Sequence, residues 1–346
     1  MDQIRIVFLG TGAAAPTRDR NVSSLAVVLD GRVLLFDCGE GTQHQLARGP
    51  VRSGAIEAIF ITHLHGDHLF GLPGLIATLG LNARSEPLTI YGPPGLARYL
   101  ESIPYPGATY PIEVVEIATN VEIAANENAG ANRETVTPLP PGEGGRALSA
   151  RPGEGRESRG NARESRRAPG YRVYAAALHH SVPCLGYAIV EDDRPGFFDV
   201  TRARDLGVPE GPLFGRLQRG HDVVVDGRTI RSRDIVGRPR QGRRIVFCTD
   251  TRPCDAAIDL ARDADVFVHE ATYANDHAQE AVDRYHSTAA EAAQVAAAAQ
   301  PRRLVLTHVS ARYETDAPLL AEALPIFPNT EVASDLLVVP VLPAAE

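Results

Sequence analysis

The sequence predicts an α/β fold made of two similar halves that pack face to face. Short hydrophobic runs, bounded by turn residues, alternate with segments in which leucine recurs at helical spacing. A strand-rich start followed by strand, helix and strand is found in both halves of the chain, which favours a paired architecture. The 346 residues are 44% hydrophobic and 23% charged, so the chain has enough apolar material for a buried core.

The first half supplies short strands with glycine-rich turns between them. These runs are rich in Val, Ile, Leu and Phe, and they span residues 4–9, 25–29, 33–36, 58–62 and 88–91. Leucine and isoleucine recur at helical spacing after Asp67, and residues 96–100 form part of another helix.

The second half repeats this alternation around two hydrophilic stretches. Its predicted strands span residues 171–178, 244–249, 266–269 and 304–307, and a polyalanine helix spans 288–299. Residues 126–170 are dominated by Gly, Pro, Arg, Glu and Ser, a composition that predicts a flexible hydrophilic insertion. Residues 191–242 form a second irregular section, in which ten arginines exceed nine acidic residues.

Charge and cysteine usage exclude some classes of protein. The net charge of −8 argues against a general nucleic-acid coat protein, although a local basic patch is compatible with it. The four cysteines are scattered without a C-x-x-C pair, which favours free thiols in a reducing compartment. The N-terminus lacks a basic leader, and no apolar run approaches the ~20 residues that span a bilayer. We expect a cytoplasmic protein that does not associate with a membrane.

One glycine motif imitates a cofactor site. Gly10 and Gly12 follow the first strand, and Asp37 ends a later one, as in a dinucleotide-binding fingerprint. That motif needs a helix to begin on its glycines, so that the helix amides hold a pyrophosphate. Residues 16–21 show no helical spacing before the next strand, so we do not expect a dinucleotide here.

The most informative segment holds His63, His65, Asp67 and His68 where a strand ends and a helix begins. Residues two apart in an extended chain point the same way, so His63 and His65 can serve one metal. Gly66 permits a tight bend, after which Asp67 and His68 can face a second metal. A lone histidine is more often a satisfied core residue, but so many ionisable groups would be costly to bury unpaired. The segment predicts a metal site, and imidazole suits zinc, manganese or iron.

Further ligands must come from the ends of other strands. The candidates there are His179 and His180, Asp250, His269 and Glu270, and His308. An aspartate that bridges both metals would complete the cage, and Asp250 is the only aspartate preceded by such a regular strand.

At this point the chain resembles the metallo-β-lactamase superfamily, and within it the ribonuclease Z family of tRNA 3′-processing endonucleases. The resemblance covers nearly the whole chain and rests on FLGTGAAAPT, LLFDCGEGTQ, THLHGDHLFGLPGL, HHSVPCLGY, FCTDTRP, HEATY, YHST and LTHVSARY, in that order. The H-x-H-x-D-H pattern alone would indicate only the superfamily. The resemblance implies one αββα sandwich domain over residues 1–346, with a protruding arm insertion in 191–242.

The resemblance also implies a ligand set of two zinc ions, with manganese or iron as alternatives. One ion would be held by His63, His65 and His180, and the other by Asp67, His68 and His308, with Asp250 as the bridge. His180 is preferred to His179 because it lies at the family's spacing before Gly186 and Tyr187. His269 matches a position that is not a ligand in the family, and we expect it to order the site from outside the ligand shell.

In the mechanism implied by the resemblance, Asp67 orients or deprotonates the attacking water. His286, oriented by Glu270, is our candidate proton donor to the leaving 3′-oxygen. The alternative is that His286 has no catalytic role and only caps the region of the polyalanine helix.

The implied substrate is precursor tRNA, bound in part by the arm, whose arginines can pair with phosphates. The family's arm commonly serves the other subunit, so the resemblance implies a homodimer. Two rival functions stay open: a small-molecule phosphodiesterase of the same superfamily, and an RNA-binding protein with an inactive metal site.

Overall fold

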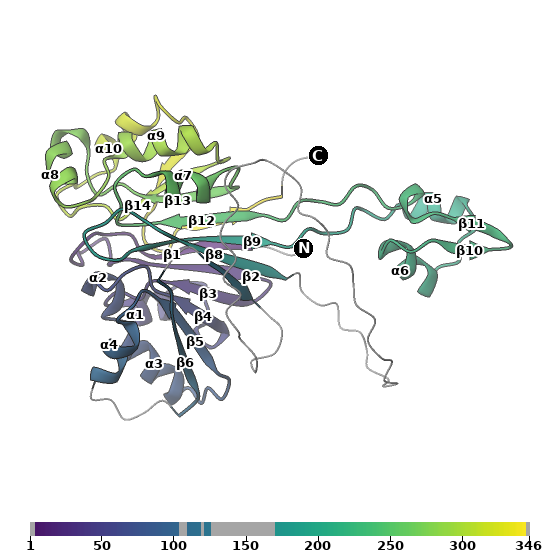
Figure 1. Ribbon diagram of the computed structural model, residues 1–346, viewed down its shortest axis with the longest axis horizontal. Coiled ribbons are helices and arrows are strands. Elements are labelled where there is room, and N and C mark those ends of the chain that lie inside the picture. Colours follow the sequence, from purple (N-terminus) through teal and green to yellow (C-terminus); the bar gives the residue numbers. More distant parts are fainter. Residues whose placement is uncertain (1–3, 104–108, 119–120, 126–169, 344–346) are drawn as a thin grey trace.

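Four layers form the body of the protein. The computed structural model describes residues 4–103, 109–118, 121–125 and 170–343. Two sheets lie face to face, and helices cover the outer face of each sheet (Figure 1). The predicted α/β sandwich of two halves is therefore confirmed.

The first sheet has the strand order β16-β1-β2-β3-β4-β5-β6. Its strands are β1 (Ile4–Gly10), β2 (Ser24–Leu29), β3 (Arg32–Phe36), β4 (Ile56–Phe60), β5 (Leu88–Gly92), β6 (Ile112–Glu116) and the C-terminal β16 (Val338–Val341). The helices of this half are α1 (Thr42–Arg48), α2 (Gly66–Leu69), α3 (Leu72–Leu81) and α4 (Leu96–Ser102), with a 3-10 turn at Ser53–Ala55.

The second sheet has the strand order β15-β14-β13-β12-β9-β8-β7. Its strands are β7 (Val121–Ala125), β8 (Tyr171–Ala177), β9 (Leu185–Glu191), β12 (Arg244–Cys248), β13 (Val266–Glu270), β14 (Leu304–Thr307) and β15 (Thr330–Val332). The helices of this half are α7 (Asp255–Ala261), α8 (Ala278–Asp283), α9 (Ala289–Ala299) and α10 (Ala317–Ala323), with a 3-10 turn at Asn275–His277.

The two sheets repeat one pairing pattern. In the first, β1, β2 and β3 pair antiparallel, and β3 to β6 pair parallel. In the second, β8, β9 and β12 pair antiparallel, and β12 to β15 pair parallel. In this repeated pattern β3 and β4 of the first sheet correspond to β12 and β13 of the second. The loops that follow these strands lie at one edge of each sheet, because parallel strands end at the same edge.

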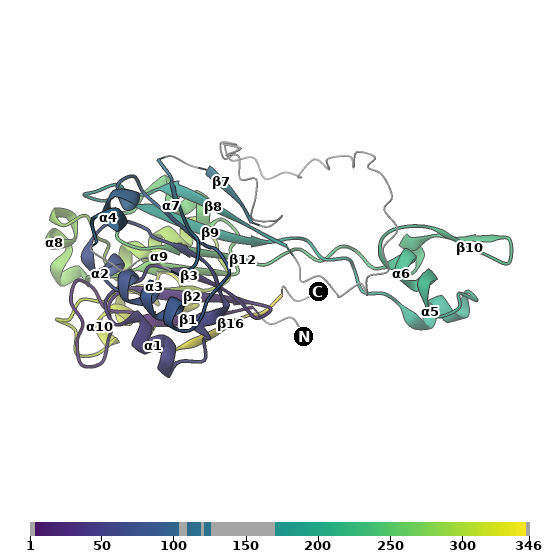
Figure 2. The ribbon, with the colours of Figure 1, turned by 90° about the horizontal axis from the view of Figure 1, so that it is seen from below.

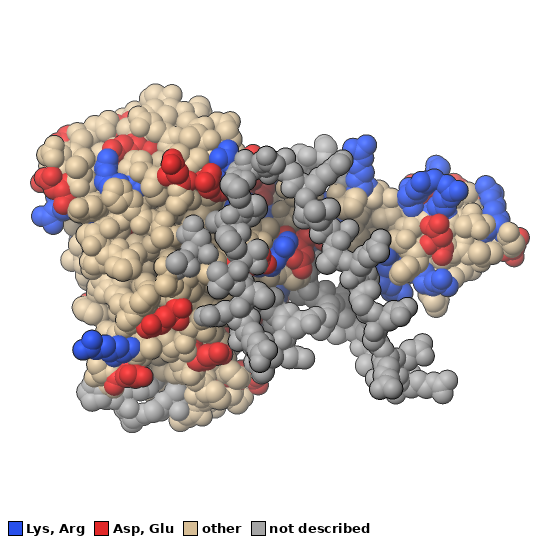
Figure 3. Space-filling view, in the orientation of Figure 1, with Lys and Arg blue, Asp and Glu red and all other residues tan. Residues whose placement is uncertain are grey.

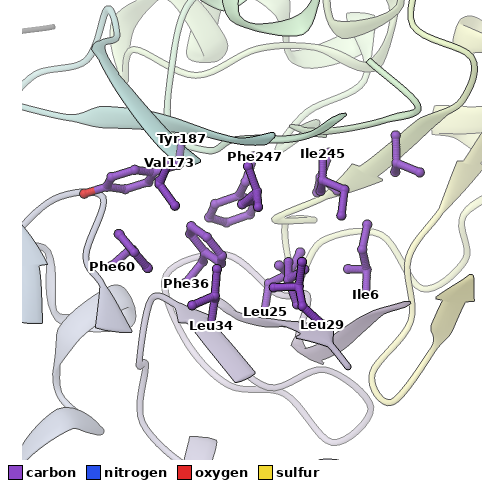
Figure 4. Packing of buried hydrophobic residues seen from close by; sticks show 14 of the residues in the cluster. Ile6, Leu25, Leu29, Leu34, Phe36, Phe60, Val173, Tyr187, Ile245 and Phe247 are labelled. Atoms are coloured by element: carbon purple, nitrogen blue, oxygen red, sulfur yellow. The ribbon is translucent and has the colours of Figure 1, made fainter. Parts of the chain in front are cut away.

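Alternating side chains divide the core into three layers. Between the sheets, Phe36 and Phe60 of the first sheet face Tyr187 and Phe247 of the second (Figure 4). The Phe36 and Phe60 rings stack at 4.9 Å. The opposite faces of the strands pack against the helices, with leucines under α3 and alanines under α9. The sheets are therefore buried on both faces, which explains their near-continuous hydrophobic runs.

Residues 192–243, here called the arm, leave the body between β9 and β12. Figures 1 and 2 show a two-stranded stem that carries a small head away from the sandwich. The stem is held by backbone pairing of Arg194 with Arg240 and of Phe198 with Val236. The head contains α5 (Val200–Asp205), α6 (Pro212–Gln218), a 3-10 turn (Ser232–Asp234) and a hairpin of β10 (Val223–Val225) and β11 (Arg228–Ile230).

The expectation of an irregular section over 191–242 was wrong for the head of the arm. The head has its own small core, which includes Ala203, Leu217 and Ile230. Its helices have only six and seven residues, so each offers too few turns for apolar spacing to show in the sequence.

Other boundaries also moved. The strand predicted at 58–62 spans Ile56–Phe60, so the loop that carries His63 begins two residues earlier than expected. The helix predicted after Asp67 is two helices, α2 and α3, with Pro73 in the first turn of α3. The predicted insertion at 126–170 lies outside the described residues except for Gly170. Among the described residues, none of the helices has the length and apolarity that a membrane crossing requires.

Candidate metal centre

The candidate ligands meet at the edge where the parallel strands of both sheets end. The His63–His68 segment follows β4, Asp250 follows β12, and His308 follows β14. Asp250 and His308 adopt left-handed backbone angles, with φ of 48° and 56°. Aspartate and histidine are among the non-glycine residues that tolerate this conformation. His180, in the loop between β8 and β9, completes the gathering.

Two groups of donor atoms share no residue: His63, His65, His180 and Asp250 make one, and Asp67, His68 and His308 make the other. A third group, Asp250, His286 and His308, overlaps with both. In the first group, the Nδ1 atom of His65 lies 2.9 Å from His63 Nε2 and 3.4 Å from His180 Nε2.

Asp250 lies between the two groups. Its Oδ2 atom is 3.6 Å from His63 Nε2, whereas its Oδ1 atom is 3.3 Å from the Nε2 atoms of both His68 and His308. Asp67 Oδ2 is 3.4 Å from His308 Nε2 and 3.5 Å from His68 Nε2. A tetrahedral zinc with bonds of ~2.0–2.1 Å needs donor atoms about 3.3 Å apart, so this donor set fits metal ions.

Asp37 orients two of these histidines. Its carboxylate lies 2.6 Å from His68 Nδ1, and it accepts a 3.0 Å hydrogen bond from the Thr62 hydroxyl. The Thr62 oxygen is in turn 3.0 Å from His63 Nδ1. Because this hydroxyl donates to Asp37, its oxygen accepts from His63. Nδ1 of each ring therefore donates to its partner, and Nε2 of each ring faces the centre, where it could bind a metal.

Glu270 repeats this arrangement in the second half. The Thr272 hydroxyl donates to Glu270 at 2.6 Å and lies 2.9 Å from His308 Nδ1. His286 Nδ1 lies 2.9 Å from Glu270 Oε1 and 3.9 Å from Asp250 Oδ2. His180 Nδ1 is 3.1 Å from the backbone oxygen of Tyr285, which again leaves Nε2 for the centre.

The carboxylates make the centre attractive to positive charge. Burial opposes protonation of His68, but Asp250 and Asp37 raise its pKa above the ordinary value. Burial, together with the neighbouring His286 and His65, lowers the pKa of His180 against the opposing effect of Asp250, so this imidazole is neutral, as a metal ligand must be. Burial likewise opposes protonation of His286, but the Glu270 carboxylate raises the pKa of His286 to about 9.

Two histidines near the cluster lie outside it. His179 is exposed, and its ring meets the Tyr285 ring edge-on at 5.7 Å. His269 lies on the opposite face of β13 from Glu270; its ring packs on Phe267, and Nδ1 bonds to the Glu270 backbone oxygen. The expectation that His269 orders the site was therefore wrong, because adjacent strand residues face opposite ways.

The sequence reasoning missed the residues that support the ligands. Asp37 entered it only as part of the dinucleotide-like motif, and Thr62 and Thr272 had no role. One signal could have found Asp37, because it follows β3 as Asp250 follows β12 in the matching half. The contacts of Asp37, Thr62 and Thr272 with the Nδ1 atoms of the histidines depend on side-chain directions, which a single sequence does not reveal.

The glycines of that motif serve close backbone packing. A Cβ atom on Gly10 would lie 1.7 Å from the Val22 backbone oxygen. No helix begins between Gly10 and β2; the chain there instead carries the Ala14 amide to Asp67 Oδ2, at 2.9 Å. Gly66 has a similar explanation, because a Cβ there would lie 2.3 Å from the Phe70 ring. The chain does change direction here, from extended backbone at His65 into α2 at Gly66, and the ring contact is a second reason for glycine at this position.

Comparison with known proteins shows that this chain has the metallo-β-lactamase fold. The family model described as a β-lactamase superfamily domain matches residues 228–309. The model described as anti-Pycsar protein Apyc1 matches residues 4–103. The structure of YhfI from Bacillus subtilis, a metallo-β-lactamase fold protein, aligns with a TM-score of 0.61 at 17% identity over 98% of this chain and all of that chain.

More specific relatives identify the family. Ribonuclease Z of Myxococcus xanthus is 43% identical over 93% of this chain and 92% of its own length. Ribonuclease Z of Acaryochloris marina is 44% identical over 96% of both chains. The structure of the short form of human tRNase Z aligns with a TM-score of 0.62 at 26% identity, over 98% of this chain and 99% of that chain. The chain belongs to the ribonuclease Z family.

Proposed function

We propose that this protein is an endoribonuclease that removes the 3′ trailer from precursor tRNA. Hydrolysis would leave a 3′-hydroxyl on the tRNA and a 5′-phosphate on the trailer. The observation that carries the proposal is the pair of donor groups that share Asp250, in a chain more than 40% identical to ribonucleases Z.

The donor groups support two zinc ions, with manganese or iron as alternatives. His63, His65 and His180 would hold one ion, and Asp67, His68 and His308 would hold the other. Asp250 would bridge them, since each of its oxygens faces a different group. Bound metal ions would acidify a water molecule and neutralise charge on the phosphate.

Asp67 is suited to orient the attacking water through a carboxylate that stays ionised. Burial opposes its ionisation, but hydrogen bonds with His308 and His68 hold the pKa of Asp67 below its ordinary value. The Ala14 amide and His308 both contact Oδ2, so the position of the carboxylate is fixed from two directions.

His286 is suited to donate a proton to the leaving 3′-oxygen. Glu270 keeps its imidazole protonated and fixes the ring through Nδ1, which leaves the Nε2–H free to point at a substrate. Glu270 itself is fixed by the Thr251 amide at 2.7 Å and by Thr272. The carboxylate therefore acts through His286 rather than on the substrate.

The arm would bind the body of the tRNA. Figure 3 shows arginine side chains gathered on its head. Arg219, Arg231, Arg233 and Arg238 contribute to the lining of an open hollow of about 1060 Å³ beside the stem. Arginine forks pair with phosphates, and such contacts dominate affinity for nucleic acid. An arm that reaches beyond its own body suits a homodimer in which it serves the other subunit.

The deciding experiment is cleavage of a 5′-labelled precursor tRNA bearing a 3′ trailer, with and without chelator. We expect one metal-dependent cut beside the discriminator nucleotide. Intact RNA together with metal-dependent hydrolysis of a small phosphodiester would replace the proposal with the phosphodiesterase alternative. An occupied metal centre that hydrolyses neither substrate would favour the inactive RNA-binding protein.

The arm's role has its own test. Backbone pairing of Asp199 with Ile235 allows the head to be replaced by an Asn-Gly turn while the stem stays paired. This deletion should raise KM for precursor tRNA and leave hydrolysis of a small phosphodiester unchanged. Replacement of Arg219, Arg231, Arg233 and Arg238 by Gln is the matched variant that keeps the fold. Equal effects on both substrates would contradict RNA binding by the arm.

A further inference from the structure

Among the described residues three Phe and Tyr side chains are exposed, and two of them adjoin segments of the metal centre. In the part of the chain that the structure describes, the exposed Phe and Tyr side chains are Phe70, Phe197 and Tyr285. Phe197 lies in the arm, where the Arg240 guanidinium covers its ring at 4.1 Å. The other two have no role in binding or activating a metal.

Phe70 borders the ligand segment of the first half. It follows α2, which carries Asp67 and His68, and its side chain is 63% exposed. The ring lies so close over Gly66 that any side chain at Gly66 would collide with it. Gly66 stands between the ligand candidates His65 and Asp67. One face of the Phe70 ring therefore packs over Gly66, and the side chain is otherwise open to solvent next to the ligand segment.

Tyr285 borders the cluster from the second half. Its side chain is 40% exposed, its backbone oxygen holds His180, and the next residue is His286. The exposed His179 ring supports the Tyr285 ring edge-on. The backbone here has a φ of 59°, an unusual left-handed value for tyrosine. This conformation lets one residue bind His180 through its carbonyl and place a ring at the rim.

We propose that Phe70 and Tyr285 stack on the two nucleobases that flank the scissile phosphate. This inference rests on the proposed function. Because Tyr285 adjoins His286, the candidate donor to the leaving 3′-oxygen, Tyr285 takes the base on the tRNA side of the cut. Phe70 takes the first base of the trailer.

Stacking suits the task of this enzyme class. Proteins recognise unpaired RNA largely by placing splayed bases on aromatic side chains. Every base has a π-face, so stacking tolerates any nucleotide at either position. The two rings would thus fix the phosphate between them without demanding a particular sequence, which suits a trailer of variable sequence.

The test couples each ring to each base. Phe70→Leu and Tyr285→Leu keep apolar bulk and remove the π-face. Each is assayed on intact precursor tRNA and on two precursors that lack the base on one side of the cut. On intact precursor, loss of one ring should lower kcat/KM about 5- to 150-fold, the range measured for single base stacks. On the precursor that lacks the partner base, the same variant should cause no further loss, whereas Phe70→Tyr should retain the coupling.

The outcomes separate this inference from the proposed function. Leu81→Ala removes an apolar side chain that is 87% exposed at the end of α3 and should act like wild type on all substrates. Metal content should be equal in all variants, since neither ring is a ligand candidate. If wild type cleaves the precursor but ring and base losses multiply, stacking is refuted and the proposed function stands. If each ring couples to the opposite base, the assignment of sides is wrong. Intact precursor with wild type would overturn both proposals.

Discussion

At the scale of single residues, two carboxylates organise the centre from behind. Asp37 holds His68 directly and His63 through Thr62, and Glu270 holds His286 directly and His308 through Thr272. Each carboxylate comes from a different half of the molecule. The rings are thereby held in one orientation before a metal binds, which lowers the conformational entropy lost on binding.

Asp37→Asn should weaken metal binding without unfolding the protein. The substitution removes the charge that stabilises the His68 Nδ1 proton, while the size of the side chain is kept. Partners of this kind typically contribute 10- to 100-fold to metal affinity. Competition with a chromophoric chelator would measure the change. Asp259→Asn, in an exposed ion pair on α7, is the control and should have wild-type affinity; an equal loss in both variants would contradict the role of Asp37.

His286→Ala should reduce single-turnover cleavage of precursor tRNA by ~10²–10⁴-fold, the usual contribution of a positioned acid. Metal content should be unchanged, because His286 is not in either proposed ligand group. His277→Ala, which changes a half-buried histidine on the 3-10 turn before α8, is the matched control. Wild-type turnover of His286→Ala would leave this residue only its structural role beside α9.

At the scale of elements, the root of the arm is an ion pair buried in the body. Arg243 donates to both carboxylate oxygens of Glu191, at 2.7 and 2.8 Å, and Arg194 of the stem contacts the same carboxylate. Glu191 and Arg243 are almost fully buried. The pair fixes the direction in which the stem leaves the sandwich, where β9 ends and β12 begins.

Glu191→Gln should lower the free energy of unfolding at neutral pH by about 3–5 kcal/mol, because it leaves Arg243 buried without its counter-ion. Burial opposes ionisation of Glu191, but hydrogen bonds from Arg243 and Arg194 hold its pKa below the ordinary value. The ion pair therefore stabilises the fold at pH values above ~4.3, the pKa of a glutamate in the unfolded chain. This stabilisation is lost as the pH falls from there through the lower pKa of Glu191 in the folded protein.

Urea unfolding at several pH values would test this prediction. The difference between wild type and Glu191→Gln should shrink as the solution is acidified below pH ~4. Glu210→Gln breaks an exposed ion pair with Arg204 in the head and should change stability by less than about 1 kcal/mol. A pH-independent difference would contradict the ionic origin.

At the scale of the whole molecule, the centre joins the two halves. The donor groups combine the loop after β4 in the first sheet with residues from three loops of the second sheet. Bound metal would therefore link the sheets through their strand ends, in addition to the apolar layer between them. Binding energy of this kind adds to the stability of the folded state.

Removal of metal should lower the melting temperature. A metal present at a thousand times its Kd stabilises the fold by ~4 kcal/mol, so scanning calorimetry with and without chelator should resolve the shift. Zinc added back should restore it. The melting temperature of Asp250→Ala should respond much less to chelator, because the shared ligand is lost. Complete metal removal with an unchanged melting temperature would contradict a link between the halves.

The sequence by itself determined the class of fold and the first four candidate ligands of the centre. Hydrophobic runs longer than a turn, and ionisable groups packed into six residues at a strand end, are local patterns with few alternative explanations. His63, His65, Asp67 and His68 were found in this way. The remaining ligand set, including the choice of His180 over His179, came from the resemblance to a family.

The tertiary structure alone decided which partners support those residues. Asp37 and Thr62 lie 25 residues apart, and Glu270 and His286 lie 16 apart, so their contacts depend on how strand ends meet in space. Glu270 and His269 lie on opposite faces of β13, so only Glu270 faces the centre. The strand β4 ends two residues before its predicted end, and this decides where the ligand loop begins. The folded head of the arm and the rings at the rim likewise appear only in three dimensions, because burial and exposure are properties of the packed chain.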